Sequence, residues 1–378
     1  MAVKIPFNRP YLTGKELDAI ADCHSRGQLA GDGYYTKECE KILESLTGAA
    51  RILLTHSCTA ALEMAALLIG IKPGEEVIMP SFTFVSTANA FVLRGATPVF
   101  VDIRKDTLNL DEKLLEGAIT CKTKAIVPVH YAGVGCGMDD ILDIAKGRGI
   151  PVIEDAAQGI QAKVDGGALG SLGDLGTLSF HETKNVISGE GGALLVNNPD
   201  FVERAEHIRE KGTNRASFFR GQVDKYTWVD LGSSYIPGEI IAAFLHSQLQ
   251  HASLITNQRL ELWSKYHEAL EPLEKDGWIR RPHIPGNCVH NAHMYYILLE
   301  TPKVRNRLMA SLQAQGIQAI FHYIPLHSSP AGKKYTRAHG SLGNTDDISQ
   351  RILRLPLWIG MPDPGVIVEK INQILKTL

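Results

Sequence analysis

The chain has 378 residues, of which 44% are hydrophobic and 21% are charged, so its composition is that of a globular protein. This length predicts two domains. The formal net charge of −2 gives no indication of a nucleic-acid or anionic-membrane partner. No apolar run approaches the roughly 18 residues that span a bilayer, which argues against a membrane protein.

The cysteines and the N-terminus indicate a cellular compartment. Six cysteines are scattered along the chain without a CxxC pair, which argues against a disulfide framework or a zinc knuckle. The first 20 residues lack the apolar core of a signal peptide. We therefore expect a cytoplasmic protein with reduced thiols and no metal site.

The first 30 residues are expected to form an arm and a helix. From about residue 50, short β-rich runs alternate with amphipathic stretches. The expected strands lie within 50–56, 75–82, 96–103, 124–133, 150–159, 175–182 and 192–198, and expected helices lie within 59–70 and 138–149. Continuous apolar strands that alternate with helices indicate a largely parallel sheet covered on both faces.

The pattern changes after about residue 245. Helical periodicity appears within 255–277, followed by a β-like run at 294–300, a helix at 304–316 and a second β-like run at 317–325. The sequence thus predicts a large α/β domain over 1–248 and a smaller α+β domain over 249–378.

Polar side chains close three of the apolar runs. These side chains are His130 and Tyr131, Glu154 and Asp155, and Ser179 and His181. A buried run that ends in such groups is costly unless each group is paired or used. Ligands bind where the strands of such sheets end, so these residues predict a site, although His130 and Tyr131 can also be satisfied strand-end groups.

The segment from Thr55 to Thr59 links a strand to an Ala-rich helix. A helix start with small hydroxyl residues offers free N–H groups and a positive dipole end to an anion. The alternative is ordinary N-capping by Ser57 or Thr59. The segment lacks the spacing of a Walker loop, and "AGVGCGMDD" lacks that of a dinucleotide fingerprint.

Asp155, Lys184 and this helix start together match the requirements of one cofactor, pyridoxal 5′-phosphate. The lysine can bond to it covalently, the aspartate can keep its ring nitrogen protonated, and the helix start can take its phosphate. Phe84 can stack on the ring, with core packing as the alternative for both Phe82 and Phe84. The glycines of "SGEGG" indicate close approach of the cofactor or of a partner chain.

Several segments together resemble one known family. "SCTAALEMAALL", "PSFTFVSTANA", "VIEDAAQG", "SFHETKNVISGEGG" and "FHYIPLH" are similar to the DegT/StrS-type nucleotide-sugar aminotransferases, and the resemblance covers nearly the whole chain. It implies the fold-type-I, aspartate aminotransferase-like architecture: a large pyridoxal-phosphate domain with a mixed, mostly parallel sheet, and a smaller α+β C-terminal domain.

The resemblance also implies roles for individual residues. Lys184 would bond to the cofactor and move the proton, and Asp155 would pair with the ring nitrogen. Gln158 would contact the 3′-oxygen, Phe84 would stack on the ring, and the phosphate would lie against Cys58, Thr59 and Ser179. The residues expected near the nucleotide sugar are Gly31, Asp32, Gly33, His181, Arg215, His322 and His327.

Two features distinguish this chain from some members of the family. Many members carry Asn and Arg in a "GYNYR" segment, where this chain has Ser234 and Ile236; Ser234 is expected to reach the phosphate of the neighbouring subunit's cofactor. A dehydratase branch replaces the lysine by His, and because Lys184 is present here, transamination is favoured. The basic cluster of Arg209, Lys211, Arg215 and Arg220 is either a solvated face or, at Arg215, a contact to the substrate's diphosphate.

The implied activity is transfer of the amino group of L-glutamate to C4 of dTDP-4-keto-6-deoxyglucose, in a homodimer that shares its active sites, for a cell-surface polysaccharide. A related enzyme that acts at C3 or on a UDP sugar is the alternative. A non-catalytic regulator on the same fold need not retain Lys184, Asp155 and the phosphate site together, so the sequence argues against it.

Overall fold

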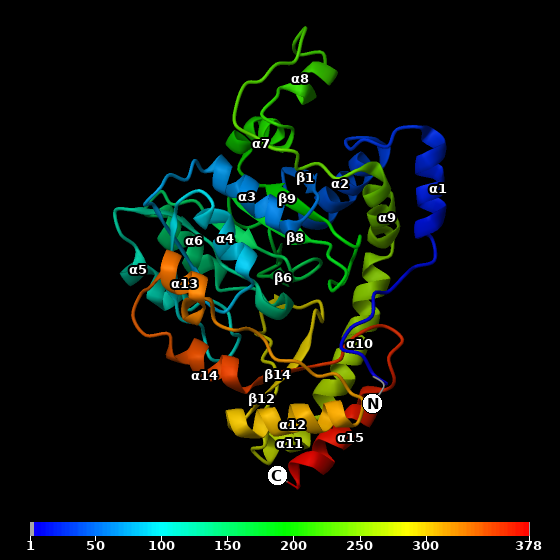
Figure 1. The fold of residues 1–378 in the computed structure, drawn as a ribbon, viewed down its shortest axis with the longest axis vertical. Helices are drawn as coiled ribbons and strands as arrows, with labels where there is room; N and C mark the ends of the chain where they lie inside the picture. Colours follow the sequence, from blue (N-terminus) through cyan, green and yellow to red (C-terminus); the bar gives the residue numbers. More distant parts are fainter. Residues whose placement is uncertain (1–3, 378) are drawn as a thin grey trace.

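The computed structural model describes residues 4–377. A central sheet organises the first two thirds of the chain (Figure 1). Its strands are β1 (Arg51–Thr55), β2 (Glu76–Pro80), β3 (Thr97–Val101), β4 (Thr123–Ile126), β5 (Ile153–Asp155), β8 (Leu175–Ser179), β9 (Gly192–Val196) and β13 (Arg337–Ala338).

Two four-stranded ladders, β13-β3-β2-β4 and β5-β8-β9-β1, make up this sheet. Parallel bridges from Ile126 to Val152 and from Val129 to Asp155 join them side by side. Only β9 runs antiparallel to its neighbours β8 and β1. The predicted mixed, mostly parallel sheet is therefore confirmed.

Both faces of the sheet are buried, as continuous apolar strands require. Successive side chains of β1 point to opposite faces: Ile52 and Leu54 belong to one hydrophobic cluster and Leu53 to the other. Most helical residues of the first cluster come from α2 (Tyr34–Thr47), α5 (Leu115–Ala118), α6 (Met138–Lys146) and α9 (Glu239–Gln250). Most of those in the second come from α3 (Cys58–Leu68), α4 (Val85–Val92) and α7 (Val202–Arg209).

A smaller antiparallel sheet, in the order β10-β12-β14, lies below the central one in Figure 1. Its strands are β10 (Ile279–Arg280), β12 (Tyr295–Leu299) and β14 (Ile352–Leu355). The helices around it are α10 (Ala252–Ala269), α11 (Glu271–Lys275), α12 (Pro302–Ala314), α14 (Gly343–Arg351) and α15 (Pro364–Leu375). The predicted boundary at 248/249 falls just before the end of α9, and this division remains a prediction.

The C-terminal third does not lie wholly apart from the large sheet. Strand β13, which follows helix α13 (Pro330–Tyr335), pairs in parallel with β3. Strand β11 (Cys288–Val289) pairs with β6 (Lys163–Val164), which in turn pairs with β7 (Gly167–Ala168). These two strand pairings connect the two parts of the chain, in addition to the α9–α10 turn.

The N-terminal arm lies against the segment around Ile317 before helix α1 (Glu16–Arg26) packs against α9 (Figure 1). Ile5 forms a parallel bridge with Ile317, and Trp358 Nε1 donates to the Pro6 carbonyl over 2.9 Å. At the opposite end, a loop around helix α8 (Arg215–Phe219) projects from the molecule and exposes Phe219, Tyr226 and Trp228. Within residues 4–377, no helix is long and apolar enough to cross a membrane.

Candidate active site

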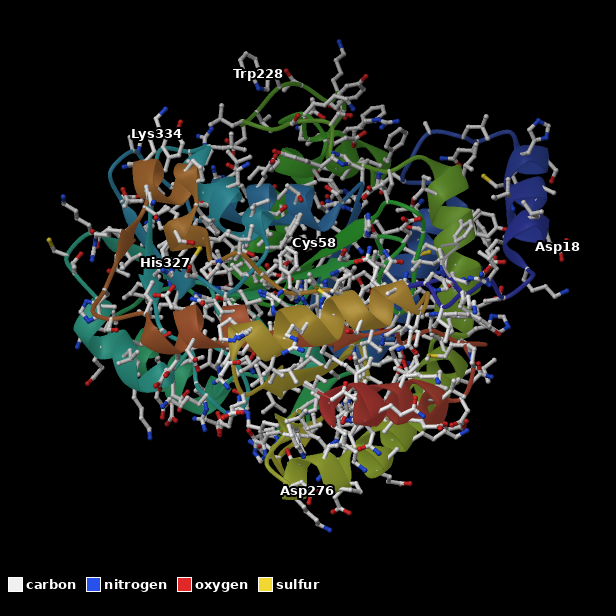
Figure 2. The ribbon with its side chains drawn as sticks, turned by 60° about the horizontal axis from the view of Figure 1, so that its bottom comes forward. Asp18, Cys58, Trp228, Asp276, His327 and Lys334 are labelled. Atoms are coloured by element: carbon white, nitrogen blue, oxygen red, sulfur yellow. The ribbon has the colours of Figure 1, made fainter. Side chains whose placement is uncertain are left out.

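Nine of the predicted site residues meet where the strands of the central sheet end. Strands β1, β5 and β8 stop at one edge, helices α3 and α4 begin there, and the 180–191 loop crosses it. A cavity of about 670 Å³ opens at this edge, and segments of the C-terminal third close it. Cys58, at the start of α3, lies near the centre of the molecule (Figure 2). The predicted residues that line the cavity are Cys58, Thr59, Phe84, Asp155, Gln158, Ser179, His181, Lys184 and His322.

Asp155 is the last residue of β5 and is only 6% exposed. Its Oδ2 accepts a hydrogen bond from Thr87 Oγ1 over 2.7 Å, and its Oδ1 accepts from the Ala157 amide over 3.2 Å. Because Thr87 has one hydroxyl hydrogen, Thr83 donates the 2.8 Å bond between the two threonines. This chain of donors fixes the Asp155 carboxylate in the wall of the cavity.

Lys184 lies in the loop after β8, where its side chain reaches the cavity. The side chain of the next residue, Asn185, donates through Nδ2 to the Asn291 carbonyl over 2.8 Å, which anchors the loop. Burial lowers the pKa of the Lys184 ammonium, against the opposing effect of the Cys58 thiol and the Asp155 carboxylate. A lowered pKa increases the neutral fraction of the amine, the form that acts as nucleophile and base.

The start of α3 has both an N-cap side chain and amides that are free for an anion, the two alternatives predicted from the sequence. Ser57 is the N-cap, and its Oγ accepts from the Ala60 amide over 3.1 Å. Within residues 4–377, the Cys58 and Thr59 amides donate to no other group of the protein, and both residues line the cavity, so these amides are available to an anion. Burial raises the pKa of the Cys58 thiol to about 12, which keeps this side chain uncharged beside a bound anion.

Two of the glycines after Lys184 make room for this chain itself, while the expected approach of the cofactor or of a partner chain stays a prediction. A Cβ on Gly192 would lie closer than 3.0 Å to the Cys58 amide nitrogen and the Ser57 carbonyl carbon. A Cβ on Gly191 would collide with Ser188 Oγ. Gly192 therefore lets the start of β9 press against the start of α3 and holds the free amides in place.

The two candidate phenylalanines differ in their exposure to solvent. Phe82 is 1% exposed and packs in a cluster with Tyr131 and Tyr323. Phe84 is 59% exposed and lines the cavity, as a ring-stacking residue requires. Gln158 directs its Oε1 to the Ala132 amide and its Nε2 to Tyr323, which leaves one amide hydrogen for a ligand.

The remaining predicted residues lie outside this cavity. Gly31 and Gly33 pack against 236–239, where the Glu239 carboxylate accepts the Gly33 amide over 3.1 Å. His327 bonds to Ser81 and Asp346. Ser234 is exposed, on the loop that leads to α9. Arg215 pairs with Glu210, and the roles of all these residues in binding stay predictions.

The basic cluster is largely paired within the chain. Arg209 is 3% exposed, and its guanidinium bonds to Asp32 over 2.6 Å and to Glu40 over 2.7 Å. Arg220 pairs with Glu206 over 2.8 Å. The interpretation as a uniformly solvated face is therefore wrong for Arg209, whose burial gave no signal in the sequence.

The strand-end pair His130 and Glu154 is also structural. Both side chains are fully buried, with 2.8 Å between His130 Nε2 and Glu154 Oε2. Glu154 also accepts the amides of Gly170, Leu172 and Gly173. Neither residue lines the cavity, so the satisfied-group alternative holds for His130.

Sequence reasoning missed several cavity residues. Thr87 lies four residues after Thr83, a helical spacing that marks two hydroxyls on one face. Tyr323 lies within "FHYIPLH", between the predicted His322 and His327. Nothing local singles out the others, which come from the N-terminal arm and the C-terminal third: Phe7, Asn8, Arg259, His293 and Arg354. Within residues 4–377, no group of three or more His, Cys, Asp or Glu side chains has the arrangement of a metal site.

The residues present fit pyridoxal 5′-phosphate. The cavity holds an amine at Lys184, a carboxylate anchored at Asp155, free amides at Cys58 and Thr59, and an exposed ring at Phe84. The sheet, the flanking helices and this combination define a fold-type-I, pyridoxal-phosphate-dependent enzyme. The chain belongs to the DegT/DnrJ/EryC1/StrS aminotransferase family, whose family model matches residues 10–372.

Comparisons with individual proteins agree with this family assignment. The spore coat polysaccharide biosynthesis protein SpsC of Bacillus subtilis is 32% identical over 98% of this chain and 97% of its own length. The aminotransferase TlmJ of Streptoalloteichus hindustanus has a TM-score of 0.90, 28% identity and 99% coverage of both chains. Spr1654 of Streptococcus pneumoniae, a sugar aminotransferase solved in a PLP-form, has a TM-score of 0.90, 26% identity and 99% coverage of both chains. The protein is a pyridoxal-phosphate-dependent sugar aminotransferase.

Proposed function

We propose that the protein transfers the amino group of L-glutamate to C4 of dTDP-4-keto-6-deoxy-D-glucose, giving dTDP-4-amino-4,6-dideoxy-D-galactose and 2-oxoglutarate. The observation that carries the proposal is the meeting of Lys184, Asp155 and the free α3 amides in one cavity. For the sugar, the support is the resemblance of "EVIMPSFTFVSTANAFVLRGA" and "IREKGTNRASFFRGQVDKYTW" to dTDP-4-amino-4,6-dideoxygalactose transaminase. The product would feed a cell-surface polysaccharide of the enterobacterial common antigen type.

Each residue has a distinct part in this chemistry. When bound, pyridoxal phosphate supplies an electron sink and a carbon that carries the amino group between the two substrates. Lys184 Nζ takes the proton from the donor's α-carbon and delivers a proton to C4 of the acceptor. Asp155, held by Thr87, keeps the ring nitrogen protonated, and the Cys58 and Thr59 amides hold the phosphate.

We further propose that the enzyme acts as a homodimer in the cytoplasm. The projecting loop with Phe219, Tyr226 and Trp228 exposes apolar area that a second copy can cover, and Ser234 follows the same loop. The partner's loop would then bring Ser234 and Arg215 to the site. All six cysteines are free, which suits a reducing compartment.

The test is product analysis. Purified protein is incubated with glutamate and dTDP-4-keto-6-deoxyglucose, and the product is examined by mass spectrometry and NMR. An axial amino group at C4 and equimolar 2-oxoglutarate are expected. Amination at C3, amination of a UDP ketosugar only, or an unchanged sugar would each contradict the proposal.

A further inference from the structure

Arg354, in the middle of β14, is half-buried and lines the active-site cavity, and its Nε is inaccessible to solvent. Its Nη2 donates a long 3.4 Å bond to the Phe321 carbonyl, and its Nε has no partner among residues 4–377. The guanidinium carbon lies 4.7 Å from the centre of the Phe7 ring. Arg209, which is buried, bonds to two carboxylates, whereas the half-buried Arg354 forms no ion pair within the described part of the chain.

Arg259, on α10, is a second guanidinium of the same kind. It is 5% exposed and lines the same cavity. Its Nε donates to the Ala292 carbonyl over 3.1 Å and its Nη2 to the His293 carbonyl over 2.8 Å, which fixes the plane of the group. Burial lowers the pKa of Arg259 to about 10, and no carboxylate among residues 4–377 pairs with it.

The cavity therefore has an excess of positive charge before any phosphate enters it. Lys184, Arg259 and Arg354 face Asp155 and Glu190, and Glu190 is largely exposed at the rim. A buried, unpaired guanidinium is unfavourable, and an anion that reaches it restores the lost interaction. The free α3 amides already provide for the phosphate of the cofactor, so the two arginines require a second anion.

We propose that Arg354, together with Arg259, binds the carboxylate groups of the amino donor and selects an α-amino dicarboxylic acid. The inference rests on the proposed aminotransferase function and adds the residues that recognise the donor. A guanidinium matches a carboxylate through two parallel hydrogen bonds, and its planar shape suits the flat wall formed by Phe7.

The position of Arg354 relative to Lys184 favours the donor over the nucleotide sugar. The charge of Arg354 contributes to the lowered pKa of Lys184, so the two groups lie within electrostatic reach of one another. In an amino acid, the carboxylate is one bond from the reacting carbon. In a nucleotide sugar, the diphosphate is separated from C4 by the sugar ring and lies farther from the lysine.

The test is calorimetric binding to the holoenzyme of three probes: glutarate, which has two carboxylates and no amino group, butyrate, which has one, and dTDP. Wild type is expected to bind glutarate more tightly than butyrate. Arg354→Gln should weaken glutarate binding about 10- to 100-fold, the effect of losing charge-assisted hydrogen bonds, and leave dTDP binding unchanged. Arg354→Lys, which keeps the charge, should bind glutarate with an affinity between those of wild type and Arg354→Gln.

Arg305→Gln is the matched control, because Arg305 also lies over an aromatic ring, Phe321, but outside the cavity. It should leave all three affinities unchanged. The inference is overturned if wild type does not bind glutarate, or if Arg354→Gln and Arg354→Lys both bind glutarate as tightly as wild type does. It is also overturned if the two variants lose affinity for dTDP and keep their affinity for glutarate. If glutarate binding depends on Arg354 but the ketosugar is not aminated, the proposed function fails and the donor site stands.

Discussion

Gly192→Ala tests whether the contact between β9 and α3 positions the phosphate site. The added Cβ would lie below 3.0 Å from the Cys58 nitrogen and the Ser57 carbonyl carbon, where ordinary contacts begin at 3.4 Å. Both neighbours are backbone atoms, so neither can rotate away, and the start of α3 must move. Such overpacking costs about 1–3 kcal/mol of folding free energy.

Gly192→Ala should also weaken cofactor binding. Amide donors work at about 2.7–3.2 Å, so a shift of the helix start by a few tenths of an ångström weakens the bonds from Cys58 and Thr59. The loss of one charge-assisted bond corresponds to about 1.5–3 kcal/mol, or roughly a 10- to 100-fold higher Kd for pyridoxal phosphate.

The assay is fluorescence titration of the apoprotein with pyridoxal phosphate, with urea unfolding measured alongside. The control is Gly286→Ala, at a glycine whose added Cβ would have nothing within 4 Å. Gly286→Ala should bind the cofactor as wild type does. A Gly192→Ala protein with wild-type Kd would show that the close contact does not position the phosphate donors.

Three further outcomes are expected. Lys184→Ala should abolish turnover and the visible absorbance of the bound cofactor while the circular dichroism spectrum stays unchanged; measurable turnover would refute the assignment. Thr87→Val should lower the free energy of unfolding of the apoprotein by about 1.5–3 kcal/mol in urea titrations, because the buried Asp155 carboxylate loses a hydrogen bond. A change below about 0.5 kcal/mol, which is the size expected for an ordinary surface substitution, would contradict this. Because burial lowers the pKa of Lys184, its amine becomes neutral at a lower pH than that of an ordinary lysine. The rate at which the apoprotein captures pyridoxal phosphate should therefore rise with pH and level off below 10.5, the ordinary pKa of a lysine. A rate that still rises above pH 10.5 would mean that the pKa of Lys184 is not lowered.

The sequence by itself determined the sheet and the centre of the site. Apolar strands alternating with helices require a sheet buried on both faces, and polar residues at the ends of such strands must meet at one edge. Asp155 and Lys184 could therefore be predicted, because each follows a strand whose pattern is visible within a few residues. The start of α3 could be read in the same way.

Only the tertiary structure decided which side chains complete the cavity and which are used internally. Arg209 and Arg354 look alike in the sequence, yet Arg209 is neutralised by Asp32 and Glu40 while Arg354 faces the cavity without an ion pair in the described chain. Gly192 is needed because Cys58, 134 positions earlier, packs against it. Periodicity and capping act over a few residues, whereas the partner of a buried charge is set by segments that meet only when the chain has folded.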